Sequence, residues 1–142
     1  MEWVKVYPWR RKGIFVCEHE GQEKFLLSVK RVSEVLKIPA RTLRWAIYHG
    51  TIPASLLPYP TTGKGFYVMT LDDIREACRH YKLPHAPVID RLGDLLGWSD
   101  EEKAFCALEW EGIAREDLEE FVATGRFPWA RVTARVRERE QV

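Results

Sequence analysis

Residues 37–54 read KIPARTLRWAIYHGTIPA, and this stretch decides the fold that we expect. Pro39 disfavours helix at the residue before it, so any helix that precedes it must end there. From Ala40 onward, apolar side chains recur at helical spacing, which predicts a second short helix that reaches about His49. Gly50 suits the left-handed residue that commonly follows a helix. The stretch therefore predicts a tight turn followed by a short helix.

The residues before this stretch predict the first of two paired helices. Ser28 suits an N-cap, because its hydroxyl can accept a hydrogen bond from a backbone N–H of the first turn. The apolar stripe of this helix is Val29, Val32, Val35 and Leu36. In the second helix the inward positions are Leu43, Ala46 and Ile47, and the outward positions are Ala40, Arg41, Arg44, Trp45 and Tyr48. Two short helices with a tight turn and an outward polar face are typical of a helix-turn-helix.

Three segments around this helix pair carry a family resemblance. They are LLSVKRVSEVLKIPARTLRWAIYHGTIPA (26–54), the Gly63-Lys64-Gly65 segment and TLDDIREACRHY (70–81). Together, over about residues 26–82, they resemble the winged helix-turn-helix of the excisionase and MerR superfamily. The resemblance implies that the second helix enters the DNA major groove. The DNA-contacting residues that it implies are Arg41, Arg44, Trp45 and Tyr48 of the helix and Lys64 of the wing.

The sequence on either side of the helix pair predicts β-structure. Residues 1–27 predict a small antiparallel sheet, because apolar and polar residues alternate between turn signals. Its basic turn supplies secondary candidates for DNA contact, namely Arg10, Arg11 and Lys12. Residues 54–69 are rich in Pro and Gly and predict a β-ribbon, the wing. Thr70 and Asp73 then predict a capping box that opens a helix to about Tyr81.

The C-terminal half predicts helices and a basic tail. Asp90 suits the start of a short helix that ends at Gly97, and Ser99 with Glu102 predicts a capping box for the next. A further helix is expected over residues 115–124, and the tail adds two basic candidates, Arg131 and Arg135. The fold class is therefore α+β. Its expected parts are a β-hairpin or sheet (1–27), a winged helix-turn-helix (28–83), a linker (84–89) and a helical region (90–142).

Residues 112–129, GIAREDLEEFVATGRFPW, echo the opening stretch at an offset of 75 residues. The pairs include Ile38 with Ile113, Leu43 with Leu118, Gly50 with Gly125 and Pro53 with Pro128. Either the C-terminal half holds a degenerate second helix-turn-helix, or any helix that ends in Gly-x-apolar-Pro gives this match. The outward face of the copy is acidic, at Glu116, Glu119 and Glu120. Phosphate would repel such a face, whereas a basic protein surface would suit it.

Composition excludes several classes of protein. With 46% hydrophobic residues in 142, the chain can bury a core. It has no run of eighteen apolar residues and no apolar block near its start, so we expect a cytoplasmic protein without a membrane partner. Three widely spaced cysteines predict reduced thiols, and no metal site, cofactor motif or catalytic motif is recognised, so we expect no enzyme. The lack of Asn and the low Gln content hint at a thermophile.

Charge and surface chemistry leave two functions open. Residues 1–90 carry 14 Lys and Arg against 9 Asp and Glu, whereas residues 91–142 carry 8 against 12. The first hypothesis is a small transcription regulator, or an excisionase-like factor, that binds double-stranded DNA. The alternative is a phage-type regulator that uses the same shape to bind RNA polymerase or a σ factor. Exposed Trp, Tyr and Arg are typical anchors of protein interfaces, which keeps this alternative open.

Overall fold

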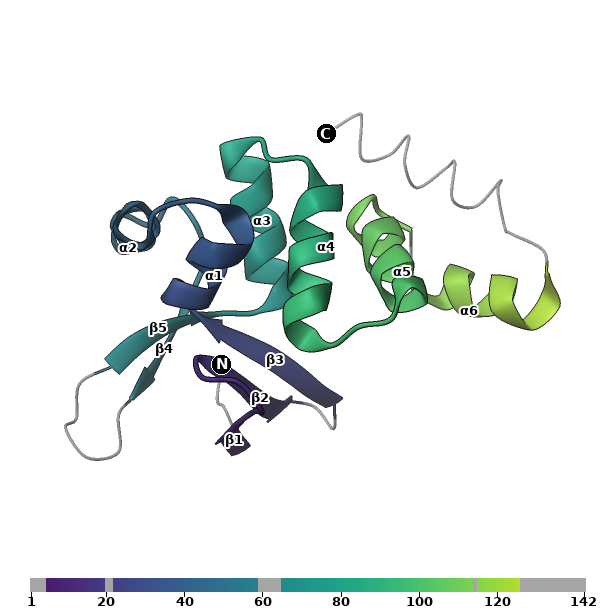
Figure 1. Cartoon of the computed structure of the whole chain (residues 1–142), viewed down its shortest axis with the longest axis horizontal. Helices are drawn as coiled ribbons and strands as arrows, with labels where there is room; N and C mark the ends of the chain where they lie inside the picture. Colours follow the sequence, from purple (N-terminus) through teal and green to yellow (C-terminus); the bar gives the residue numbers. More distant parts are fainter. Residues whose placement is uncertain (1–4, 20–21, 59–64, 114, 126–142) are drawn as a thin grey trace. The chain divides into compact units, whose positions relative to one another are not determined.

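The computed structural model describes residues 5–19, 22–58, 65–113 and 115–125, and it divides the chain into two compact units (Figure 1). Unit 1 is Met1–Pro84 and unit 2 is His85–Val142. The described strands all belong to unit 1, and unit 2 is helical over its described residues. The predicted α+β class is therefore confirmed.

The described strands of unit 1 form one antiparallel sheet in the order β1-β2-β3-β5-β4. The strands are β1 (Lys5–Pro8), β2 (Ile14–His19), β3 (Gln22–Ser28), β4 (Ser55–Pro58) and β5 (Gly65–Met69). The strands expected before residue 28 and the ribbon expected after residue 54 are joined, because Leu27 of β3 pairs with Met69 of β5. The boundary drawn between residues 27 and 28 therefore runs through one continuous sheet, since local patterns do not show pairing across forty residues.

Three helices follow from local capping chemistry in unit 1. They are α1 (Val29–Leu36), α2 (Ala40–Tyr48) and α3 (Leu71–Tyr81). Ser28 Oγ accepts a hydrogen bond from the Arg31 backbone N–H at 3.4 Å, and Thr70 with Asp73 forms the expected reciprocal capping box. Burial raises the pKa of the Asp73 carboxyl, and the hydrogen bonds from Thr70 oppose that shift.

The core of unit 1 joins these helices to the sheet. The predicted stripe of α1 is entirely buried. Helices α1 and α3 contact β5, and α1 also contacts β3. Fully buried side chains in this unit include Ile14, Leu26, Leu27, Val32, Leu36, Leu43, Val68, Met69 and Ile74. Because α1 is fixed against the sheet, it also fixes the position from which α2 departs.

Unit 2 begins with a helix where a linker was expected. Helix α4 spans His85–Leu96, so the predicted helix start at Asp90 is wrong and residues 85–89 are helical. The two units nevertheless divide between Pro84 and His85, inside the segment predicted as a linker. Pro87 is tolerated because it lies in the first turn, where a missing backbone N–H leaves no intrahelical bond unmade. Val88 and Ile89, which lie in the segment predicted as a linker, are buried side chains of this helix. The predicted end is right, since Gly97 follows α4 with φ +77°.

Helix α5 (Asp100–Trp110) is tied to α4 by ion pairs, and α6 spans Arg115–Thr124. Lys103 Nζ lies 2.6 Å from Asp94 Oδ1 and 3.0 Å from Asp90 Oδ1, and these hydrogen bonds, with Asp94 first, raise the pKa of Lys103. The predicted capping box at Ser99 is half formed. Ser99 Oγ accepts from the Glu102 N–H at 3.2 Å, while the Glu102 carboxylate accepts from the Ser99 hydroxyl.

Candidate nucleic-acid interface

The turn between α1 and α2 is set by a lysine in the left-handed region. Lys37 has φ 60° and ψ 38°, and its backbone N–H donates to the Ser33 carbonyl. The Ser33 hydroxyl in turn donates to the Ile38 carbonyl at 2.6 Å. Pro39 then occupies the N-cap of α2. These local bonds fix the direction in which α2 leaves the core.

Helix α2 separates a buried face from a solvent face, as the sequence predicts. Leu43 and Ala46 are buried and Ile47 is half-buried. The predicted outward residues Arg41, Arg44, Trp45 and Tyr48 are all exposed. Ala40 is half-buried, so its predicted outward position is only partly right, because the first turn still lies against the turn from α1. The four exposed side chains, which we call the α2 face, follow one stripe along the helix.

Two aromatic rings of the α2 face stand in solvent. Trp45 is 63% exposed and Tyr48 is 78% exposed, and both are far above what a core aromatic shows. The His49 ring contacts both, with its centroid 4.2 Å from that of Trp45 and 5.4 Å from that of Tyr48. The sequence analysis missed His49, although its place four residues after Trp45 is the spacing at which helical side chains meet. The contact with Trp45 is tilted, with an angle of 44° between the ring planes, and the contact with Tyr48 is edge-on at 87°.

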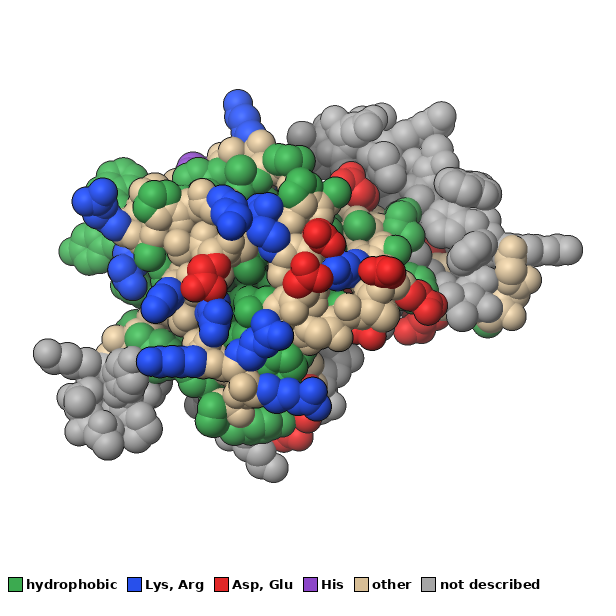
Figure 2. All heavy atoms as spheres, viewed as in Figure 1, with side chains coloured by type: hydrophobic (Ala, Val, Ile, Leu, Met, Phe, Trp, Pro, Cys, Tyr) green, Lys and Arg blue, Asp and Glu red, His purple; other side chains and the backbone are tan. Residues whose placement is uncertain are grey.

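The charged side chains in the stretch that holds the α2 face are all positive. Residues 35–71 contain no Asp or Glu, a signal that the sequence analysis did not use. Lys37, Arg41 and Arg44 are exposed in this stretch. Figure 2 shows Lys and Arg side chains spread around α1 and α2, with few acidic side chains among them on the face in view. A partner that carries phosphates or carboxylates would therefore meet no like charge within this stretch.

The N-terminus of α2 lacks a side-chain cap. Ser28, Thr70 and Ser99 each accept a backbone hydrogen bond at the start of their helices, whereas Pro39 makes no such bond. The positive end of the helix dipole is consequently not neutralised by a capping oxygen. An anion that approaches this end would be attracted by the dipole as well as by the neighbouring cations.

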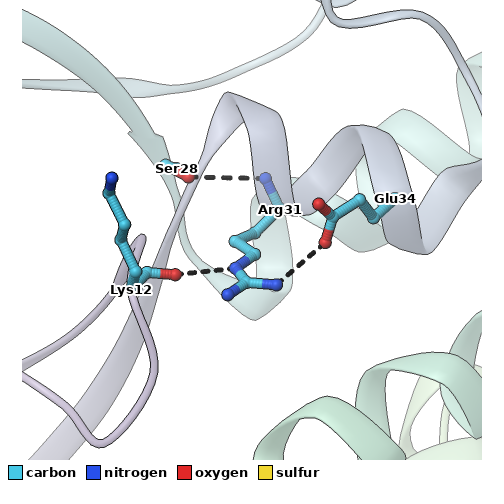
Figure 3. A network of polar contacts seen from close by, with 4 residues as sticks. All are labelled: Lys12, Ser28, Arg31 and Glu34. Atoms are coloured by element: carbon cyan, nitrogen blue, oxygen red, sulfur yellow. Dashed lines mark hydrogen bonds and ion pairs between the residues drawn. The ribbon is translucent and has the colours of Figure 1, made fainter.

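Arg31 has a structural task in the same unit (Figure 3). Its Nε donates to the Lys12 carbonyl at 2.6 Å, and its Nη1 lies 3.0 Å from Glu34 Oε2. These bonds connect the turn before β2 to α1, so Arg31 is not counted among the cations of the interface. Lys12 takes part through its backbone, and its ammonium points away from the network in Figure 3. Gly13 follows with φ +81°, and a Cβ there would lie 2.7 Å from Ser28 Oγ.

The other predicted site residues fall elsewhere. Arg10, Arg11 and Lys12 are exposed, and Arg10 Cζ lies 5.8 Å from the centre of the Trp9 ring. The acidic candidates Glu116, Glu119 and Glu120 are exposed on α6 in unit 2, while their neighbour Asp117 is buried. Lys64, Arg131 and Arg135 lie outside the described residues.

Metal-ligating clusters and membrane-spanning helices are two other features that could mark a site in the described part of the chain. No three or more His, Cys, Asp or Glu side chains there are grouped so that they could hold a metal ion. None of its helices is both long enough and apolar enough to cross a membrane. Comparison with known proteins yields no match to a family model, to a curated protein or to a solved structure.

Proposed function

We propose that unit 1 is a DNA-binding module of winged helix-turn-helix type, and that the protein is a small transcription regulator or an excisionase-like factor. The observation that supports this most is the α2 face, which presents Arg41 and Arg44 to solvent in a stretch free of acidic residues. Cations on an exposed helix suit the phosphate-lined walls of a groove.

The dimensions of α2 are compatible with this role. An α-helix with its side chains is about 10–12 Å across, and the major groove of B-DNA is about 12 Å wide. Nine residues give a helix about 13 Å long, enough to reach several base pairs. The β4–β5 pair, with Leu56 opposite Tyr67, would serve as the wing.

The charges give a measurable salt dependence. Three exposed cations lie at or beside α2, namely Lys37, Arg41 and Arg44. If each neutralises one phosphate, the plot of log Kobs against log salt has a slope of about −2.7 from these contacts, at about −0.9 each. Removing both arginines should make the slope about 1.8 units less steep.

The test is fluorescence anisotropy with a labelled mixed-sequence duplex over a salt series from ~50 mM. The double variant Arg41→Ala, Arg44→Ala should bind more weakly and with the shallower slope. The matched control is Arg79→Ala, Lys82→Ala, which removes the same charge from exposed positions at the end of α3. Wild-type protein that shows no binding at ~50 mM salt would contradict the proposal, because non-specific binding should be detectable there.

A protein partner is the second candidate, and the exposed rings favour it. Trp, Tyr and Arg are the residues that most often anchor protein interfaces, and the α2 face holds all three types. In this alternative the face binds RNA polymerase or a σ factor. Purified polymerase should then bind the wild type and fail to bind Trp45→Ala, Tyr48→Ala, while duplex DNA binds neither. DNA binding that depends on the arginines would favour the first candidate instead.

The proposal extends to the repeat in unit 2. Helices α5 and α6 occupy the positions that the 75-residue offset assigns to α1 and α2, and Gly125 has φ +71° where Gly50 has φ +73°. We infer a second copy whose exposed carboxylates do not contact DNA. Glu116→Gln, Glu119→Gln should therefore leave DNA affinity unchanged or raise it, as anisotropy would show. A fall in affinity would contradict that role.

A further inference from the structure

The outward side chains of α2 offer mainly hydrogen-bond donors. Arg41 and Arg44 can only donate, and so can the indole N–H of Trp45. Helix α2 contains no Asn, Gln, Asp or Glu, which are the side chains that pair with adenine or accept from cytosine. Thr42, Tyr48 and His49 can donate and accept, so they favour neither class of base.

The major groove offers this donor-rich face a clear choice. Guanine presents two acceptors, N7 and O6, and thymine presents the acceptor O4 beside its methyl group. Cytosine presents only an amino group, which is a donor, and adenine presents an amino group beside the single acceptor N7. An arginine that meets an amino group gains no hydrogen bond there and leaves its own donors without their water partners. The charged part of the α2 face therefore favours the keto bases, guanine and thymine.

The aromatic part of the face favours one of those two bases. Trp45 and Tyr48 are exposed, and each contacts the His49 ring. The thymine methyl is the apolar group of the major groove, and apolar side chains are its usual contacts. Trp and Tyr side chains have few rotatable bonds, so they give up little side-chain entropy when they cover such a methyl.

We propose that α2 reads a run of keto bases, guanines and thymines, on one strand of the duplex. The arginines would contact guanine, and Trp45 and Tyr48 would cover thymine methyl groups. This inference rests on the proposed DNA-binding function and specifies the sequence class that the same face selects.

Two duplexes of equal length and composition test it. One has alternating G and T on one strand and alternating A and C on the other, so that one strand is entirely keto. The second has alternating G and A opposite alternating T and C, so that both strands are mixed. Both duplexes offer the arginines the same guanines, so the wild type should bind the first about fourfold more tightly for each thymine methyl that the second moves to the opposite strand. The Arg41→Ala, Arg44→Ala variant should bind both duplexes more weakly than the wild type.

A third duplex isolates the methyl group. It replaces thymine by uracil in the G/T strand and changes nothing else in the groove. Wild-type affinity should fall about fourfold for each methyl group that the rings would otherwise cover. The variant Trp45→Ala, Tyr48→Ala should bind the thymine and uracil duplexes equally, and Arg79→Ala should respond to the methyl as the wild type does.

The possible outcomes distinguish failure of the keto-strand inference from failure of the DNA-binding proposal. Equal binding to the first two duplexes would overturn the keto-strand inference and leave the DNA-binding proposal standing. Tighter binding to the single G/T strand than to its duplex would also overturn the inference, since stacking on the rings would then replace groove reading. No binding to any duplex at ~50 mM salt would overturn the proposed function itself.

Discussion

Replacing Lys37 by glycine should stabilise unit 1 and weaken the DNA binding that we propose. Lys37 ends α1 in the left-handed region, with φ 60° and ψ 38°, where a β-carbon is crowded and glycine is preferred. A non-glycine residue in this region costs about 1–2 kcal/mol, and the larger freedom of glycine in the unfolded chain offsets part of the gain, which leaves about 0.5–1 kcal/mol. In a domain of this size, 1 kcal/mol corresponds to a melting-temperature shift of about 4–8 °C.

Lys82 offers a matched control. It ends α3 in almost the same conformation, with φ 55° and ψ 42°, and it too is exposed. Lys82→Gly removes the same charge and relieves the same crowding, but at a position away from the start of α2. Both variants should therefore gain similar stability. Only Lys37→Gly should bind DNA more weakly, and its salt slope should become about 0.9 units less steep, the value for one phosphate contact.

The measurements are hydrogen exchange for stability and anisotropy for binding. The slowest amides of α1 and β3 exchange on unfolding of the unit and report its free energy directly. Lys37→Arg, which keeps the charge and the conformation, should bind DNA as the wild type does. If neither glycine variant is stabilised, the reasoning about the left-handed lysines is wrong. If both variants bind DNA equally weakly, Lys37 makes no phosphate contact of its own.

Three further predictions concern the scaffold. Gly13→Ala should destabilise unit 1 by about 2 kcal/mol in urea unfolding, because φ +81° disfavours a side chain and the new Cβ would lie 3.0 Å from Arg31 Cγ; an unchanged midpoint would refute the clash. The pKa of Lys103 is raised in the folded protein, so its ion pairs add stability that is fully present below the ordinary pKa of 10.5 and is lost as the pH rises above that value. Lys103→Met should therefore reduce the loss of folded protein at alkaline pH, measured by far-UV circular dichroism. An unaltered loss would show that other groups cause it. Iodoacetamide should label the half-buried Cys106 before the buried Cys17, whose thiol pKa is raised by burial, and mass spectrometry that finds the reverse order would contradict the described packing.

Local signals predicted much of unit 1. The caps at Ser28 and Thr70, the stripe of α1 and the exposed face of α2 depend on residues within a turn or two of one another. The residues that form these caps and faces lie close together in the sequence, so a short segment is enough to predict them. The same reasoning failed at the start of α4, where two nearby prolines outweighed the apolar residues Val88 and Ile89 that the helix buries.

Contacts between distant residues were beyond such windows. The pairing of Leu27 with Met69 joins parts of the sheet that the sequence assigned to separate domains. Arg31 looks like any other surface arginine until the Lys12 carbonyl is seen beside it. Asp117 is buried although the acidic residues beside it in the sequence, Glu116 and Glu119, are exposed.

The sequence by itself determined that residues 37–54 form a turn and a short helix with Arg41, Arg44, Trp45 and Tyr48 outward, because periodicity and capping act within the helix. Tertiary structure alone decided which cations remain available for a partner. It assigns Arg31 to the fold through a carbonyl nineteen residues away, and it leaves Arg41, Arg44, Trp45 and Tyr48 exposed. The physical reason is that a charge or a ring becomes available for binding only when no group brought near by folding has already engaged it.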